Sequence, residues 1–162
     1  MIALVTGEQA LSTGDVASAV GVTDPLPDST VPLALVRKAD ANTATGIVGV
    51  VEGHMTLTAQ PQREDEQDAP PIMELRSADG PAQPGDYVAL TVLGVAEVKV
   101  RDGPSTQPGQ RLTASDVVGT VRALRTETLN GMIVSEGAPI IGTALAGSEP
   151  GKDTIPVFVT LR

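Results

Sequence analysis

The sequence contains no cysteine and no tryptophan, and it has one tyrosine, Tyr87, and one phenylalanine, Phe158. Without cysteine the chain forms no disulfide, has no thiolate nucleophile and offers no sulfur ligand for zinc. Carbohydrate-binding faces and platforms for single-stranded nucleic acid depend on exposed aromatic rings. The composition therefore counts against several common kinds of functional site.

Basic residues are also few. Lys and Arg number 11 against 20 Asp and Glu, so the formal net charge is −9. Such a chain repels nucleic-acid phosphates and anionic membrane surfaces, and we expect no nucleic-acid partner. No apolar run approaches the ~20 residues that cross a bilayer, so we expect no membrane insertion. The apolar start, Met1–Val5, is short and has no basic residues before it, so we expect no signal peptide in this chain.

Catalytic and metal-binding patterns are scarce as well. His54 is the one histidine, and no Gly-x-Ser-x-Gly elbow accompanies it. Neither of the glycine-rich phosphate loops, Gly-x-x-x-x-Gly-Lys and Gly-x-Gly-x-x-Gly, is present. The acidic residues Glu64, Asp65, Glu66 and Asp68 lack the Asp-x-Asp-x-Asp-Gly spacing of a calcium loop. We therefore assign no catalytic, cofactor-binding or metal-binding residue, and we expect that the protein is not an enzyme.

What the sequence has in abundance is valine and threonine, which favour strands, together with 17 glycines and 13 prolines spread along the chain. Residues 155–161 alternate apolar and other side chains with a period of two, and residues 96–101 do the same. No amphipathic run of ten residues favours a helix. These patterns predict an all-β fold of short antiparallel strands in a sandwich or barrel.

The sharpest local signal is Asn130-Gly131. This dipeptide is typical of a two-residue type I′ turn, because both positions need a positive φ. We expect residues 121–129 to pair with residues 132–135 in a β-hairpin.

A polar, acidic and proline-flanked segment, residues 60–71, divides the chain. We expect an N-terminal β lobe over residues 1–59, a loop or linker over 60–71 and a C-terminal β lobe over 72–162. A loop this long is uncommon unless it has a role. The alternative to a plain linker is an arm that presents Ile72, Met73 and Leu75 to a neighbouring subunit.

Two short patterns recur on the two sides of this segment. Residues 13–16 (Thr-Gly-Asp-Val) resemble residues 84–88, and residues 45–50 (Thr-Gly-Ile-Val-Gly-Val) resemble residues 139–144. This echo predicts that the two lobes are related by duplication.

The second half contains an ordered series of turn and strand patterns: Pro84–Leu90, Gly94–Val100, Gln107–Ser115, Ala138–Leu145 and Ile155–Leu161. This series resembles the C-terminal β domain of large bacterial and phage surface proteins. In phage tailspikes the related domain is an intramolecular chaperone that trimerises and can release itself by self-cleavage. A looser similarity, through residues 45–50, is to phage head-decoration proteins.

The resemblance implies a homo-oligomeric β module, a trimer or higher assembly, on a virion or an extracellular surface. No residue here matches a self-cleavage nucleophile. We therefore expect a structural protein of a fibre, tail, shell or surface layer, and a head-to-tail contact would give a filament. Two alternatives remain: a module that binds a protein or glycan through its loops, and an autoproteolytic or hydrolytic domain.

Overall fold

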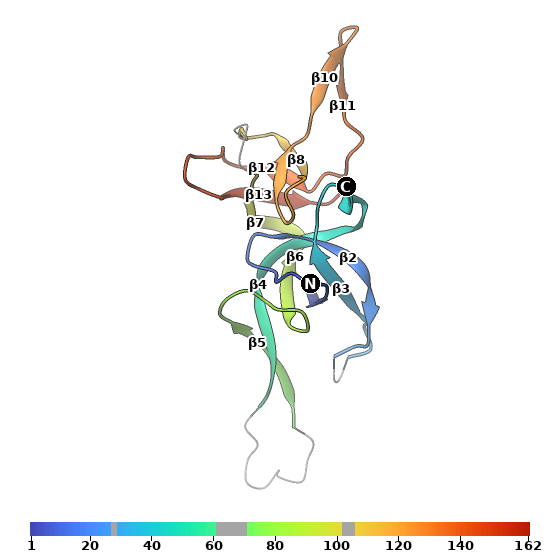
Figure 1. The fold of residues 1–162 in the computed structure, drawn as a ribbon, viewed down its shortest axis with the longest axis vertical. Helices are drawn as coiled ribbons and strands as arrows, with labels where there is room; N and C mark the ends of the chain where they lie inside the picture. Colours follow the sequence, from blue (N-terminus) through green and yellow to red (C-terminus); the bar gives the residue numbers. More distant parts are fainter. Residues whose placement is uncertain (27–28, 61–70, 102–105) are drawn as a thin grey trace.

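A computed structural model describes residues 1–26, 29–60, 71–101 and 106–162. Nearly all of its regular structure is β, as the sequence predicts (Figure 1). The described residues form thirteen strands and one 3₁₀ turn: β1 (Ile2–Val5), β2 (Val16–Thr23), β3 (Leu33–Lys38), η1 (Ala44–Gly46), β4 (Ile47–Ala59), β5 (Met73–Ala78), β6 (Tyr87–Thr91), β7 (Leu93–Lys99), β8 (Arg111–Ala114), β9 (Val121–Ala123), β10 (Thr126–Leu129), β11 (Met132–Ser135), β12 (Gly142–Ala144) and β13 (Thr154–Thr160).

The first half of the chain closes into a small barrel. Its strands follow the order β2-β3-β1-β6-β4, and β4 pairs again with β2 to complete the circle. The neighbours are antiparallel except β1 and β3, which run parallel. Closure removes free strand edges from this body. Strand β5 is added to the far part of β4 and lies outside the circle.

The second half forms a five-stranded sheet in the order β7-β13-β12-β8-β9. Val100, directly after β7, forms a parallel bridge with Val121 of β9, and the Arg101 N–H donates to the Val121 carbonyl at 3.0 Å. This contact joins the two ends of the sheet and closes a second barrel. Strands β10 and β11 pair only with each other.

The two barrels share one topology. If the barrel strands are taken in chain order, β1, β2, β3, β4 and β6 correspond to β7, β8, β9, β12 and β13. In both halves the first and third strands are the parallel neighbours, and every other neighbouring pair is antiparallel. The sequence echo therefore has a structural counterpart: the chain contains the same small barrel twice.

The correspondence holds residue by residue, because the cross-strand partners match around both circles. Equivalent buried positions are Ala3 and Val98, Ala17 and Leu112, Val36 and Val121, Val51 and Ala144, Val88 and Ile155, and Leu90 and Val157. The echo of residues 45–50 in 139–144 falls on equivalent strands, β4 and β12. The echo of residues 13–16 in residues 84–88 does not fall on equivalent strands. Those residues precede β2 and β6, which are two different strands of the same barrel.

These two Gly-Asp segments do adopt the same turn. In each, the carboxylate of Asp15 or Asp86 accepts a hydrogen bond of 2.7 Å from the backbone N–H three residues earlier. A third copy lies before β8, where the Gln110 side-chain oxygen accepts the Gln107 N–H at 2.8 Å. The glycine before each of these residues has a positive φ, between 84° and 97°. The recurring pattern is therefore a turn that starts a strand, used three times.

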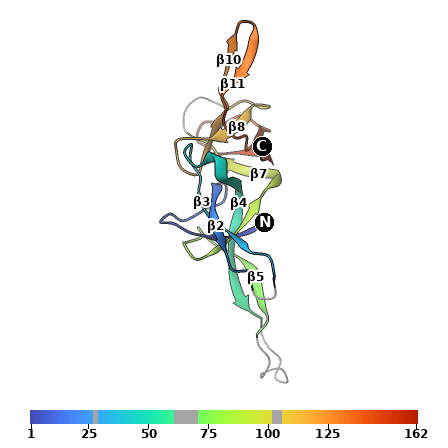
Figure 2. The same cartoon turned by 90° about the vertical axis from the view of Figure 1, so that its right-hand side faces the viewer.

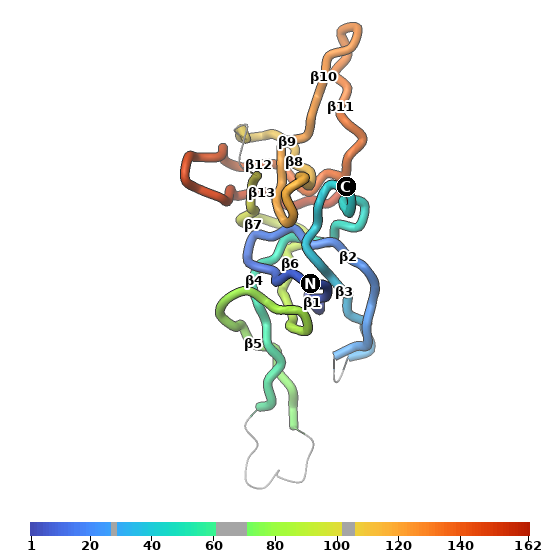
Figure 3. Tube along the Cα trace, viewed as in Figure 1, coloured from blue at the N-terminus to red at the C-terminus, as the bar shows by residue number. Residues whose placement is uncertain are grey.

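Two apolar cores fill the barrels. One lies inside the first barrel, and the other fills the second barrel and continues onto Val16, Ala39, Ala44 and Val50 of the first. The outer faces of β2 and β4 thus pack against the second barrel. Figure 3 shows the result, with the blue-to-green half and the yellow-to-red half stacked along the long axis.

The boundary between the two barrels lies later in the chain than the sequence predicts. The expected boundary at residues 60–71 would assign β5 and β6 to the C-terminal lobe, yet β6 pairs with β1 and β4, and β5 pairs with β4. The chain passes to the second barrel between Thr91 and Leu93. The acidic segment itself falls mostly on residues 61–70, which lie outside the described part of the chain.

A buried carboxylate, Asp15, connects the two barrels at the joint between them. Asp15, from the first barrel, is 2% exposed, and its two oxygens lie 3.2 Å from Nζ of Lys38 and 2.8 Å from Nζ of Lys99. Lys99 belongs to the second barrel. The Lys99 N–H also donates to the Gly14 carbonyl at 2.9 Å, so side-chain and backbone bonds connect the barrels at one place.

Candidate functional site

Two hairpin arms extend from opposite ends of the stacked barrels (Figures 1 and 2). The first arm consists of the outer part of β4 with β5, and the second consists of β10 with β11. Each interrupts the shared barrel topology at a different place. The first lies between the fourth and fifth strands of its barrel, and the second between the third and fourth. Since the other barrel closes without the corresponding arm, neither arm is a necessary part of the barrel.

The second arm is a strongly exposed apolar feature of the described chain. All eight residues of β10 and β11 are exposed, including Leu129, Met132, Ile133 and Val134 at 54%, 66%, 78% and 44%. The turn between the strands is the predicted one, with φ of 51° at Asn130 and 82° at Gly131. The pairing covers 126–129 with 132–135 rather than 121–129, because residues 121–123 pair with β8 as part of the barrel.

The pairing register sorts the side chains of this arm onto two faces. Cross-strand partners share a face, so Leu129 and Met132 lie beside Glu127 and Val134. The opposite face carries Thr126, Thr128, Ile133 and Ser135. One face is therefore mainly apolar, with a single carboxylate near the base.

A charged clamp holds the base of the second arm. Glu136, just after β11, accepts two hydrogen bonds from the Arg122 guanidinium, one of them at 3.0 Å, and a third from the Arg125 backbone N–H at 2.8 Å. The hydrogen bond from Arg122 is the main reason that the pKa of Glu136 lies below its usual value. The same pair raises the pKa of Arg122. Both groups stay charged at neutral pH, so the clamp ties the base of the arm to β9.

The first arm carries two of the three residues that the sequence singles out. Met73 and Leu75 lie on one face of β5, where they oppose Ala59 and Leu57 of β4. All the side chains on that face except Ser77 are apolar, and Met73, Leu75 and Leu57 are half-buried. Ile72 precedes β5 and is 61% exposed. Two of the three predicted residues thus lie on the first arm, and Ile72 directly precedes it.

Near the base of the second arm, an apolar groove of about 390 Å³ lies where the two barrels meet. Its walls are formed by Ala44, Thr45, Ile47, Pro139, Ile140, Leu161 and Arg162. Residues 139 and 140 follow the second arm in the chain, and the carbonyl and N–H of Ile140 bond to the backbone of Arg162 at 2.9 Å. The groove is therefore a shallow apolar recess with one charged side chain, Arg162, at its end.

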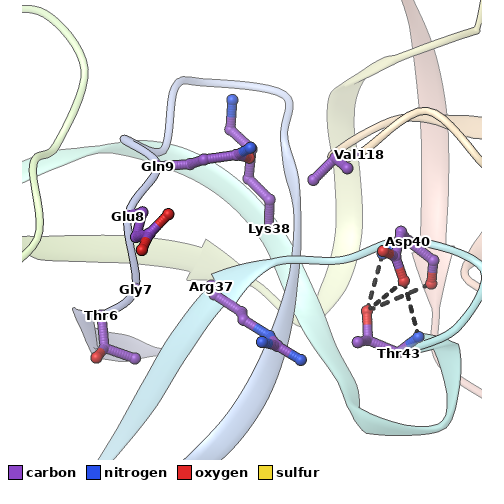
Figure 4. Close-up of a pocket in the computed structure, with 9 residues that line it drawn as sticks. All are labelled: Thr6, Gly7, Glu8, Gln9, Arg37, Lys38, Asp40, Thr43 and Val118. Carbon is purple, nitrogen blue, oxygen red and sulfur yellow. Dashed lines mark hydrogen bonds between the residues drawn. The ribbon is translucent and has the colours of Figure 1, made fainter.

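A polar depression of about 440 Å³ lies at the end of the first barrel (Figure 4). Among its charged side chains, Lys38 is paired with Asp15, and Asp40 accepts hydrogen bonds from the backbone N–H and the hydroxyl of Thr43. Figure 4 shows Glu8 and Gln9 on the opposite side from Asp40. Lys38 and Asp40 are thus each engaged by a neighbouring group, whereas Glu8 and Arg37 form no ion pair within the described residues.

His54 lies beside the first arm and contacts two groups. Its Nε2 is 3.3 Å from an Asp86 carboxylate oxygen, and its Nδ1 is 3.3 Å from the Asp79 carbonyl. The same Asp86 oxygen accepts the Gln83 N–H that closes the turn before β6. The imidazole therefore braces two turns against β4, a structural use of the ring.

Sequence reasoning missed most of the apolar arm residues. Leu57 and Met55 could have been found, because residues 54–59 alternate polar and apolar side chains. No sequence pattern indicates that Leu129, Met132 and Val134 are exposed, since an apolar strand after Asn-Gly is equally typical of a buried hairpin. The Arg122–Glu136 clamp joins residues 14 positions apart and also leaves no local pattern.

Among residues 1–26, 29–60, 71–101 and 106–162, no three His, Cys, Asp or Glu side chains gather as a metal site would require. The same described residues include no helix of the length and apolarity needed to cross a bilayer. Comparison of the chain with protein-family models, curated proteins and solved structures gives no significant match.

Proposed function

We propose that the protein is a structural module that assembles with copies of itself, and that its two hairpin arms make the contacts between subunits. One observation carries the proposal: the second arm exposes four large apolar side chains on a hairpin that no described part of its own chain covers. A two-stranded hairpin is at best marginally stable alone in water. Contiguous exposed apolar surface on an otherwise closed, edge-free body marks an interaction site.

The duplicated barrel supports the same function. Each barrel is a rigid, closed scaffold, and the ion-paired joint fixes one barrel against the other. Such a body is suited to hold two contact surfaces at a constant separation, as a repeating unit of a tail, fibre, shell or surface layer requires. The resemblance of the second half to surface assembly domains favours a trimer or higher assembly at a virion or cell surface.

A loop-based binding module is the second candidate. The observation in its favour is the polar depression of about 440 Å³ at the end of the first barrel. Lys38 is already paired with Asp15, and Glu8 lies on the opposite side of the depression from Asp40, so assembly remains the better-supported function. For an autoproteolytic or hydrolytic domain, His54 would be the natural base, yet the ring is engaged by Asp86 and by the Asp79 carbonyl.

Electron microscopy of the purified protein tests the proposal. Assembly predicts particles or fibres far larger than a 16.5 kDa chain. Fields that contain no such objects, at concentrations where circular dichroism shows folded β protein, would contradict assembly and favour the binding module.

A further inference from the structure

We infer that the second arm of one subunit lies in the apolar groove of a second copy of the same chain. This inference rests on the proposed self-assembly and specifies the surfaces that meet. The arm supplies its apolar face, Leu129, Met132 and Val134, and the groove supplies Ile47, Pro139, Ile140 and Leu161.

Shape and chemistry agree between the two surfaces. The arm is a narrow convex apolar ridge, and the groove is an apolar recess of about 390 Å³. At roughly 30 Å³ per water, the empty recess would hold on the order of a dozen waters against apolar walls. Replacing them with the side chains of Leu129 and Met132 removes apolar surface from water on both partners, which is the main driving force of association.

The charges at the edges are complementary. Glu127 shares the apolar face of the arm, and it forms no ion pair with any described residue. The Arg162 side chain at the end of the groove likewise lacks an ion-pair partner within the described part of the chain. Seating the arm in a second copy can bring these opposite charges together and set the direction of the arm.

Position in the fold explains why the occupant is another copy. The groove lies at the base of the arm of its own chain, whereas the apolar residues of that arm extend toward a tip that points away from the body (Figure 1). The Glu136 clamp holds that direction, so the tip does not fold back onto its own groove. In an assembly, the tip of each subunit can reach the groove of the next, and each copy then uses both surfaces.

The absence of cysteine allows a direct test by crosslinking. One set of chains carries Met132→Cys on the arm, and a second set carries Thr45→Cys on the exposed rim of the groove. The two are mixed, diluted and reconcentrated so that subunits exchange, and a short bismaleimide is added. We expect a covalent dimer in which mass spectrometry finds residue 132 joined to residue 45. Val22→Cys in place of Thr45→Cys is the control, because Val22 is 71% exposed but lies on β2, away from the groove, and it should give no such product.

Other surfaces that could receive the second arm are tested in the same way. Leu57→Cys reports on the first arm, and Val95→Cys reports on an exposed apolar patch where Val95 lies opposite Phe158. Preferential joining of residue 132 to either of these, while Thr45→Cys stays unreacted, would overturn the groove assignment and leave self-assembly intact. A wild-type chain that remains a monomer at every concentration would overturn both.

A charge exchange provides a second readout. Glu127→Arg and Arg162→Glu should each weaken association several-fold, and the double variant should recover most of the loss. Single variants that associate as strongly as wild type would contradict the pairing of these two side chains. So would a double variant whose loss of affinity equals the summed losses of the two single variants.

Discussion

Gly49 of β4 and Gly142 of β12 are equivalent residues in the two barrels, and each lies directly against the backbone of the next strand. A Cβ on Gly49 would approach the Thr91 carbonyl oxygen to 2.9 Å, and a Cβ on Gly142 would meet the carbonyl oxygen of Phe158. Thr91 and Phe158 are themselves equivalent positions on β6 and β13. The same close approach of two strands is therefore built into both copies of the barrel.

This relationship predicts the effect of adding one methyl group. Gly49→Ala and Gly142→Ala should each lower the free energy of unfolding by about 1–3 kcal/mol, because a carbonyl fixed in a strand cannot move aside easily. Gly53→Ala is the matched control on β4, since a Cβ there would meet nothing within 4 Å. Urea unfolding followed by circular dichroism measures all three. Equal midpoints for Gly49→Ala, Gly53→Ala and wild type would disprove the close packing.

A second prediction concerns the joint between the barrels. Asp15→Ala should destabilise the protein by about 2 kcal/mol or more, because it leaves Lys38 and Lys99 without their shared carboxylate and the Ser12 N–H without an acceptor. Asp86→Ala removes the same hydrogen bond from the similar turn before β6, together with the contact to His54, at a side chain that is 39% exposed. Calorimetry should show a clearly larger loss for Asp15→Ala than for Asp86→Ala. Equal losses would mean that the ion pairs add nothing to the joint.

The clamp at the base of the second arm predicts that the mobility of this arm depends on pH. The pKa of Glu136 is lowered in the folded protein, chiefly by the hydrogen bond from Arg122. Its stabilising effect is therefore complete above the ordinary Glu pKa of about 4.3 and is lost as the pH falls through the lower folded-state value. Backbone ¹⁵N relaxation of residues 126–135 should show mobility that increases as the pH is lowered stepwise below the ordinary Glu range, while β13 remains rigid.

Glu136→Gln should reproduce that mobility at pH 7, because it removes the charge that pairs with Arg122. Glu149→Gln is the control, since Glu149 forms a similar pair with Lys152 on an exposed loop far from the arm. If the arm stays as rigid in Glu136→Gln as in wild type, the clamp does not fix its direction.

His54 is predicted to be dispensable for assembly. His54→Ala removes contacts to Asp86 and to the Asp79 carbonyl, which brace turns of the first barrel. Sedimentation velocity should give the same distribution of species for His54→Ala and wild type. A shift to the monomer would assign the ring a role in the subunit contact that we have not given it.

The all-β class was predictable because side-chain alternation and turn residues are local properties of the chain. The Asn130-Gly131 turn followed from the same logic, since only a few residues tolerate a positive φ. The choice between a sandwich and a barrel, and the strand pairs that close each barrel, were not predictable. Closure depends on contacts such as Val100 with Val121, in which a parallel bridge joins strands that the sequence shows only as separate apolar runs.

The boundary between the barrels illustrates the same limit. The acidic segment is the strongest change in composition, yet β6, which follows it, pairs with β1 at the other end of the first half. Long-range pairing decided the domain boundary, and composition marked only an insertion. Met73 and Leu75 were selected from the sequence for their position after that segment, whereas the exposure of Met132 depends on how far its hairpin extends from the barrel.

The central claim is that this chain assembles with itself through its exposed arms. The most direct measurement is light scattering coupled to size-exclusion chromatography, on wild type and on Met132→Glu, across a dilution series. Our account predicts a wild-type mass of at least three times 16.5 kDa at high concentration. It also predicts a shift of Met132→Glu toward the monomer, with Val22→Glu behaving as wild type. A wild-type mass of one chain at every concentration would contradict the account.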